Sequence, residues 1–196
     1  YIGGMKPGTL LLYNREDPEV CRLVQSFAGH LRAVPYGMPV YRYESGIAIV
    51  DTADGPVSLS VFGSHNLLNM QAALAVCREL GVAEKEFYQA IASFTGAARR
   101  LERIAETENI VAFRDFAHAP SKLKATLDAV REAYAQHRLI ACFELHTYSS
   151  LNADFLGEYA HCMDAADEAV VFFSKHTLDL KKLPLLPEES GLKAFA

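Results

Sequence analysis

An acid and an imidazole stand close together after an apolar run in the second half of the chain. Asp115 closes the run 109–114, His118 comes three residues later, and Pro120 then opens a segment with helical spacing. A carboxylate can accept hydrogen bonds from ligand hydroxyl groups, and an imidazole can exchange a proton near neutral pH. Structural roles are equally common, since an Asp before a helix is often a cap. The local pattern alone leaves both interpretations open.

A second polar group follows the next apolar run. Glu144 ends the segment 138–144, and His146 and Tyr148 come directly after it. In an open α/β sheet, ligands bind beyond the carboxyl ends of the strands. Two successive strand ends would deliver an acid, imidazoles and hydroxyl groups to one edge of the sheet, where we predict a binding site.

The segment 63–73, GSHNLLNMQAA, is another candidate. Asn66 and Asn69 are three residues apart, so they share a face of the first helical turn. Each carboxamide offers a donor and an acceptor, which together could bind the edge of a heterocycle. The expected role of Ser64 is structural, as the cap of the helix.

The last candidate is the segment 94–102, FTGAARRLE, in which Gly96 permits a sharp turn between domains. Arg99 and Arg100 are adjacent and point in different directions, so at most one is expected to serve a site. A guanidinium suits a phosphate because its planar fork forms two parallel charge-assisted hydrogen bonds. The structural alternative is a surface ion pair with Glu102 or Glu106.

The elements that must position these residues follow from the apolar periodicity. In the first half, Gly81 is placed to end a helix. The strands expected there are 9–13, 46–51 and 57–62. Three helices are also expected, one that starts at Pro18, one over 65–80 and one over 84–92.

The second half alternates regularly between strands and helices. Strands are expected at 109–115, 138–144 and 168–174, with helices from Pro120 and over 153–165 between them. This order predicts an α/β fold with a doubly wound parallel sheet and right-handed crossovers. Residues 1–93 do not share the order, so we predict two domains, 1–93 and 94–196. The pattern stops at residue 196, and we expect the second domain to be incomplete.

Composition excludes several classes of function. The 196 residues carry a net charge of −5, so there is no general basic face for a nucleic-acid backbone. No apolar run approaches the roughly 20 residues of a membrane span. The four cysteines lie in apolar stretches and are expected to be reduced core residues of a cytoplasmic protein. Residues 1–14 show neither a signal peptide nor an initiator Met, so we expect the chain to be part of a longer protein.

Taken together and in order, three of these segments resemble the Mur ligase family, the ATP-dependent amide ligases that act on UDP-N-acetylmuramoyl compounds. The family's G-x-H-N-x-x-N helix start is matched by 63–69, its F-x-G linker with consecutive basic residues by 94–102, and its D-[YF]-[AG]-H-x-P strand end by 115–120. The resemblance spans nearly the whole chain. It implies that residues 1–93 form the C-terminal portion of the central ATPase domain and that residues 94–196 form most of the Rossmann-like C-terminal domain.

The resemblance also implies roles for individual residues. Nucleotide binding is expected at a set drawn from both halves: His65, Asn66, Asn69, Arg100 and Asp115. His118 and His146 would be catalytic and face the incoming amino substrate, with Ser121, Tyr148 and Ser149 binding that substrate. ATP and Mg²⁺ would be held mostly by the remainder of the central domain, because this sequence has no G-x-x-x-x-G-K-[ST] phosphate loop. This chain alone is therefore expected to be inactive. The guanidinium of Arg100 and the carboxylate of Asp115 should meet at a cleft between two lobes.

The implied reaction joins an amine to UDP-N-acetylmuramate through an acyl phosphate, and two branches of the family fit. We favour the murein peptide ligases, which add the tripeptide L-Ala-γ-D-Glu-meso-diaminopimelate during wall recycling, because of Phe116 and Glu144. The other branch adds L-alanine in peptidoglycan synthesis; its members usually carry two arginines within the segment matching 146–150, where this chain has none. An alternative of another class is a non-catalytic module that binds a nucleotide or a partner, since a fold does not determine a function.

Overall fold

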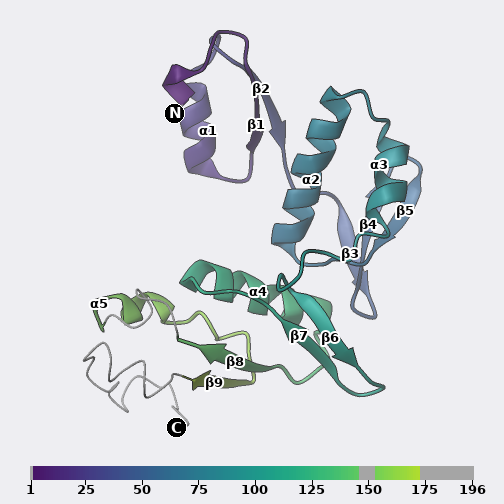
Figure 1. Ribbon diagram of the computed structural model, residues 1–196, viewed down its shortest axis with the longest axis vertical. Helices are drawn as coiled ribbons and strands as arrows, with labels where there is room; N and C mark the ends of the chain where they lie inside the picture. The colour runs from purple at the N-terminus through teal and green to yellow at the C-terminus, as the bar shows by residue number, and fades with distance from the viewer. Residues whose placement is uncertain (1, 146–152, 173–196) are drawn as a thin grey trace. The chain divides into compact units, whose positions relative to one another are not determined.

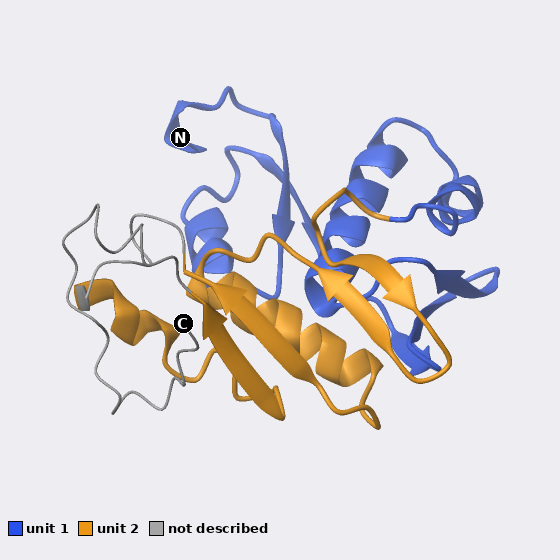
Figure 2. Cartoon of the chain, turned by 60° about the horizontal axis from the view of Figure 1, so that its bottom comes forward, with its two compact units in different colours: residues 1–95 blue, residues 96–196 orange. Residues whose placement is uncertain are grey.

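The computed structural model describes residues 2–145 and 153–172, which belong to two compact units. Unit 1 comprises residues 1–95 and unit 2 comprises residues 96–196, as the two colours of Figure 2 show. The observed division after Thr95 lies two residues beyond the boundary that we predicted between 93 and 94.

Unit 1 begins with a parallel β–α–β unit (Figure 1). Strand β1 (Leu10–Asn14) leads into helix α1 (Pro18–Gln25), and strand β2 (Arg32–Tyr36) pairs with β1 in parallel. Strand β1 and helix α1 were predicted from the sequence, whereas β2 was not, and this single β–α–β unit is not repeated in unit 1. Pro35 explains the omission, because proline cannot donate to a ladder and is tolerated only at the edge of a sheet.

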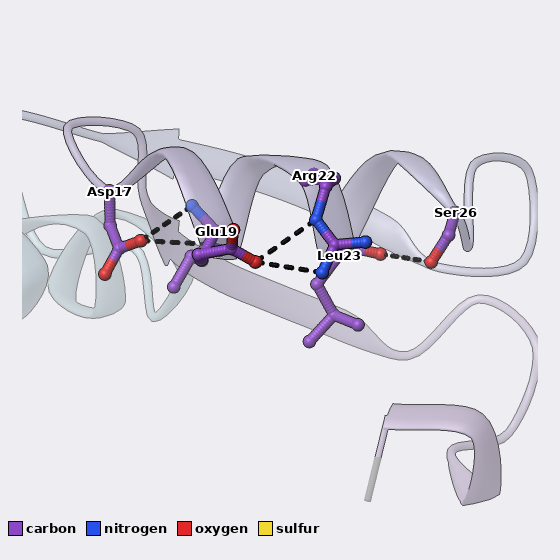
Figure 3. Close-up of polar contacts among 6 residues, drawn as sticks. Asp17, Glu19, Arg22, Leu23 and Ser26 are labelled. Carbon is purple, nitrogen blue, oxygen red and sulfur yellow. Dashed lines mark hydrogen bonds and ion pairs between the residues drawn. The ribbon is translucent and has the colours of Figure 1, made fainter.

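Local side-chain contacts determine where α1 begins (Figure 3). The carboxylate of Asp17 accepts hydrogen bonds from the amides of Glu19 at 2.9 Å and Val20 at 3.0 Å, and Pro18 occupies the first helical turn. These bonds satisfy amides that have no partner within the helix. One turn further on, the Glu19 carboxylate pairs with the guanidinium of Arg22 at 2.9 Å. The start predicted from Pro18 is confirmed.

An antiparallel sheet follows in unit 1. It has the order β3 (Tyr41–Glu44), β4 (Ile47–Thr52) and β5 (Gly55–Leu59). The last two strands were predicted, whereas β3 was missed. Ser45 and Gly46 connect β3 to β4 with φ angles of 51° and 77°, the left-handed conformations that a two-residue hairpin turn requires.

Two helices complete unit 1, α2 (Ser64–Glu79) and α3 (Glu84–Ile91), both close to the predicted bounds. Helix α2 packs against β1, β2 and α3. Gly81, with φ of 82°, donates its amide to the Arg78 carbonyl and ends α2 as predicted. The buried core of the unit draws on all these elements and includes Ala48, Val50, Leu59, Phe62, Leu67, Met70, Leu74, Phe87 and Tyr88.

Unit 2 begins with a β-hairpin, of which one strand was predicted from the sequence. Strand β6 (Glu102–Glu106) pairs antiparallel with β7 (Val111–Arg114), and the register shifts by one residue between Arg103 and Ala105. Only β7 was predicted. The residues of β6 are half-buried or exposed and lack the alternating apolar pattern by which a strand is recognised.

The remainder of unit 2 contains the predicted parallel pairing. Helix α4 (Pro120–Ala133) is followed by β8 (Ile140–Glu144) and, later, by β9 (Glu168–Phe172), which pairs with β8 in parallel. Within the described ranges, the ladders join β9 to β8 and β7 to β6. The predicted α/β fold with a parallel sheet is thus confirmed, with an antiparallel hairpin added before it.

The helix predicted over 153–165 is much shorter in the structure. Helix α5 covers Ala153–Leu156, and a 3-10 turn, η3, covers Gly157–Tyr159 before irregular turns begin. Gly157 disfavours continuation of the α-helix, because glycine loses the most backbone freedom in a helix interior. His161, with φ of 62°, lies in the left-handed region that no α-helix can include.

The core of unit 2 forms where α4 meets the parallel strands; Figure 2 shows this helix lying along the strands of the unit. The predicted stripe on α4 is buried at Leu123, Leu127 and Val130 and half-buried at Tyr134. The first two of these pack into a cluster with residues of the strands and of the turns before β9: Ala141, Phe143, Leu145, Tyr159, Cys162 and Val171.

The cysteines are not uniformly core residues, which corrects the prediction. Cys162 is buried, Cys21 and Cys77 are half-buried, and Cys142 is exposed. Cys142 lies in β8 between buried Ala141 and Phe143, so the alternation of side chains along a strand directs it to the opposite face. The described helices include none that is both long and apolar enough to cross a membrane.

Candidate functional site

The β6–β7 hairpin brings Arg100 and Asp115 together. Glu102 pairs with Arg114 in the ladder, so the residues before β6 run alongside the residues after β7. The amide of Leu101 donates a hydrogen bond of 3.0 Å to Oδ1 of Asp115. Arg100, one residue earlier, is therefore next to the chain segment that carries the acid. The strand that the sequence analysis missed is the element that positions this pair.

The backbone around Arg100 has an unusual conformation. Arg99 and Leu101, on either side of it, have φ angles of 59° and 46° in the left-handed region. Residues other than glycine adopt this region rarely, and they persist there only where surrounding contacts hold them. Such contacts exist at Arg99, whose amide donates to the carboxylate of Glu102 at 2.8 Å and whose carbonyl accepts from the amide of Phe116 at 3.0 Å.

The main role of Glu102 is therefore to hold the linker backbone through the Arg99 amide, and its ion pair with an arginine is secondary. Its carboxylate also accepts from the guanidinium of Arg114 at 3.0 Å. The Arg99 amide, and secondly Arg114, lower the pKa of Glu102 below its usual range. The surface ion pair that we considered for the two linker arginines is absent for Arg100: its exposed side chain forms no ion pair within the described part of the chain. A free guanidinium is thus available to an anion.

Asp115 is half-buried and held from two directions. While Oδ1 accepts from the Leu101 amide, Oδ2 accepts from the hydroxyl of Thr126 on α4 at 2.6 Å. An ionised carboxylate offers about four acceptor positions, so these two bonds leave about half of them for the donors of a ligand. Vicinal hydroxyl groups are donors of the right kind.

His118 is oriented by its own loop. Its Nδ1 lies 3.1 Å from the carbonyl oxygen of Phe116, and the two rings are 5.0 Å apart. A carbonyl only accepts, so Nδ1 carries the proton in this bond and the neutral ring keeps an acceptor at Nε2. The carbonyl of His118 in turn accepts from the hydroxyl of buried Tyr159 at 2.7 Å. Burial raises the pKa of Tyr159, so this hydroxyl keeps its proton at neutral pH.

The candidate residues of unit 1 lie at the start of α2. His65 and Asn66 are half-buried and Asn69 is exposed. The amide group of Asn66 donates to the Phe62 carbonyl at 2.9 Å, which leaves its side-chain oxygen as an acceptor. Ser64 does not cap the helix as predicted, because Gly63 occupies the cap position and no side chain bonds there.

The remaining candidates have different outcomes. Ser121 is exposed in the first turn of α4. His146, Tyr148 and Ser149 lie outside the described residues, so the predicted second half of the binding edge stays a prediction. Among the residues that are described, no group of three or more His, Cys, Asp or Glu side chains could hold a metal ion.

Two residues that hold the site, Thr126 and Tyr159, were not predicted from the sequence, and Glu102 was considered only as an ion-pair partner of the linker arginines. Thr126 could have been found from its position in the second turn of a helix whose start was predicted. Helical side chains point back towards the N-terminus, so its hydroxyl is directed towards the residues before the helix, which include Asp115. Tyr159 acts on a residue 41 positions away, and the local pattern contains no sign of that contact.

Comparison with known proteins gives the same family for the second unit. Residues 99–184 match the family model described as Mur ligase, glutamate ligase domain. A UDP-N-acetylmuramate–L-alanine ligase from Renibacterium salmoninarum is 39% identical over 176 residues, covering 84% of this chain and 37% of the relative. One of the same name from Cutibacterium acnes is 33% identical over 178 residues, covering 81% and 36%.

Solved structures show that the fold is shared. UDP-N-acetylmuramate-alanine ligase MurC from Thermotoga maritima superposes with a TM-score of 0.65 at 22% identity, covering 95% of this chain and 42% of that one. MurF from Acinetobacter baumannii gives a TM-score of 0.68 at 19% identity, covering 97% and 43%. At such identities the likeness concerns the fold alone.

The chain belongs to the Mur ligase family, as the sequence motifs indicated, and its second unit carries the family's glutamate ligase domain. Its extent is limited. The two relatives named above are matched over 36% and 37% of their own length, so the chain spans little more than a third of each.

Proposed function

We propose that this chain is part of an ATP-dependent ligase that forms an amide bond on UDP-N-acetylmuramate. Membership of the Mur ligase family and the names of the relatives support this reaction. The observation that carries the proposal is the β6–β7 hairpin, which brings the backbone of Arg100, whose side chain is exposed, next to the segment that holds the half-satisfied carboxylate of Asp115. Such a pair suits a ligand with both anionic and hydroxyl groups, and a nucleotide has both.

Each residue has a proposed part in this reaction. Arg100 neutralises phosphate charge, and Asp115 accepts hydrogen bonds from ribose hydroxyl groups. Asn66 and Asn69, with His65, bind the base. Nε2 of His118 accepts a hydrogen bond or a proton from the incoming amine. ATP, when bound, supplies the phosphoryl group that activates the carboxylate of the muramoyl substrate. Mg²⁺ is proposed to be held mainly by parts of the full-length protein outside this chain.

L-alanine is the proposed amine. The relatives are named for L-alanine, and this favours the synthetic branch over the tripeptide ligase that the sequence motifs favoured. The tripeptide stays a second candidate because of Phe116, Glu144 and the segment 146–150, which lacks the arginines usual in the alanine branch. Both candidates share the nucleotide site and differ only in the acceptor.

The full-length protein decides between them. It should be mixed with UDP-N-acetylmuramate, ATP and Mg²⁺, and with either L-alanine or the tripeptide, while phosphate release and the mass of the product are followed. Release that requires L-alanine supports the proposal, and release that requires the tripeptide assigns the second candidate. Nucleotide binding without release in either mixture would favour a non-catalytic module. This chain alone should release no phosphate.

Arg100→Ala tests the proposed charge neutralisation. Its loss should lower ATP turnover by about a hundredfold, the effect typical of removing one group that stabilises developing charge. The matched control is Arg103→Ala in the adjacent strand, whose guanidinium pairs with Glu106 at 2.7 Å instead. The control should keep wild-type turnover, and both variants should melt within a few degrees of wild type. Equal turnover in all three proteins would contradict the assignment of Arg100.

A further inference from the structure

The carboxylate of Asp115 has one partner that the sequence motifs do not include. Thr126 lies eleven residues later, on α4, and its Oγ1 is 2.6 Å from Oδ2 of Asp115. An ionised carboxylate has no proton to give, so the hydroxyl donates. Hydrogen bonds to a charged acceptor are shorter and about twice as strong as neutral ones, and this separation lies in their range.

The geometry of the Asp115 carboxylate is set by two donors from separate elements. Leu101 approaches from the linker through its amide, and Thr126 approaches from the helix through its hydroxyl. With only the linker bond, the carboxylate could still rotate about its last torsion, which has a broad energy profile. The helix bond removes that freedom. The remaining acceptor positions of Asp115 then point in defined directions before any ligand arrives.

The threonine side chain is suited to this task. Its β-branched carbon restricts χ1 in a helix, although its hydroxyl can also bond to a carbonyl one turn back. Here the hydroxyl bonds to Asp115, and Thr126 is half-buried beside the buried residues Leu123 and Leu127 of the same helix. Partial burial and the hydrogen bond therefore both restrict one short, stiff side chain.

We propose that Thr126 is a positioning residue, which orients the side-chain carboxylate of Asp115 for nucleotide binding. The inference rests on the proposed function, in which Asp115 binds ribose hydroxyl groups. Without the Thr126 hydroxyl, a nucleotide must itself order the carboxylate as it binds, and this ordering weakens affinity. The loss falls on nucleotide binding, because the hydroxyl of Thr126 is not itself a ligand of the substrate.

Two substitutions in the full-length protein separate the hydroxyl from the packing. Thr126→Val keeps the branched shape and removes the donor, whereas Thr126→Ser keeps the donor and removes the methyl group. The valine variant should raise the KM for ATP and the Kd for ADP by about tenfold, or about 1.4 kcal/mol. Its kcat and its KM for UDP-N-acetylmuramate should stay within about twofold. The serine variant should restore both nucleotide constants to near wild type.

Thr107→Val is the matched control in the same unit. Thr107 also uses its hydroxyl locally, accepting from the Ile110 amide at 3.1 Å in the hairpin turn, and it has no part in the proposed site. The control should keep the wild-type KM for ATP. A valine variant at 126 with unchanged nucleotide constants would overturn the inference, and so would a serine variant as impaired as valine.

A double-mutant cycle tests whether Thr126 acts through Asp115. In an Asp115→Asn background, Thr126→Val should change the Kd for ADP by less than about twofold, because the effects of residues in one network do not add. Independent, multiplying effects would overturn the inference. Wild-type protein that binds ADP without turnover refutes only the proposed reaction, and the dissociation constants then decide on Thr126. Wild-type protein that binds no nucleotide refutes both.

Discussion

The two units hold their candidate residues in different ways. In unit 1, His65, Asn66 and Asn69 lie on α2, a regular helix of 16 residues whose backbone bonds determine their spacing. In unit 2, Arg100, Asp115 and His118 lie outside regular elements. Their positions depend on individual contacts, such as the bond between the Asp115 carboxylate and the Leu101 amide.

The difference shows what each kind of scaffold requires from side chains. A helix positions residues three apart through its own periodicity, so the loss of one side chain leaves its neighbours in place. The linker of unit 2 includes left-handed Arg99 and Leu101, which cost energy and persist only through the carboxylates of Glu102 and Asp115. We therefore expect single substitutions to have larger structural effects around the site of unit 2.

Asp115→Ala against Asn66→Ala gives the sharpest comparison. The first removes two hydrogen bonds to a charged group and should destabilise the linker by about 2–3 kcal/mol; the second removes one neutral bond to Phe62 and should cost about 1 kcal/mol. Native-state hydrogen exchange can measure the first effect at the Leu101 amide and the second in the first turn of α2. Equal losses in the two units would break the comparison.

Gly63→Ala tests the backbone scaffold of unit 1. Gly63 caps α2 with φ of 92° and ψ of 138°, a conformation that residues with a Cβ rarely adopt, so the substitution should destabilise unit 1 by about 1–3 kcal/mol. Gly4→Ala is the control, because an added Cβ there meets nothing within 4 Å and its φ is not positive. Urea unfolding followed by circular dichroism can detect the difference. If both variants matched wild type, the start of α2 would not depend on glycine.

The smallest expected effect is on the acid sensitivity of unit 2. In unit 2, Arg131 and then the Leu139 amide lower the pKa of Asp167, with bonds of 2.6 and 2.7 Å. A lowered folded-state pKa gives stability that is present above the ordinary value of 3.8 and is lost as the pH falls through the folded value. Asp167→Asn should therefore flatten the decline in melting temperature from about pH 5 to about pH 2. An unchanged slope would mean that this carboxylate does not contribute.

Elements with strong local signals were predicted well from the sequence. The bounds of α2 followed from its helical pattern and from Gly81 after it, and the start of α4 followed from Pro120. The parallel pairing of β8 with β9 followed from two apolar runs separated by a crossover. These predictions rest on interactions within a few residues, or on burial of a whole strand.

Elements that depend on a partner were missed. Strand β2 contains Pro35, and β6 exposes most of its residues, so neither has the apolar alternation of a buried strand. The candidate site shows the same limit. Asp115 and Arg100 were identified by motif, whereas Thr126 and Tyr159 were not, because their contacts appear only once distant segments have folded together.

The extra residue in β6 determines where the hairpin can tolerate insertions and deletions. The ladder gains one residue around Ile104, between the pairs Arg103–Phe113 and Ala105–Ala112. Side chains alternate with a period of two along a strand, so removing that residue would exchange the inward and outward sides at the start of the hairpin. Glu102 and Arg103, the two paired residues before the shift, would then exchange the faces towards which their side chains point. Natural variants should thus tolerate insertions in the turn 107–110 more readily than deletions between residues 100 and 106.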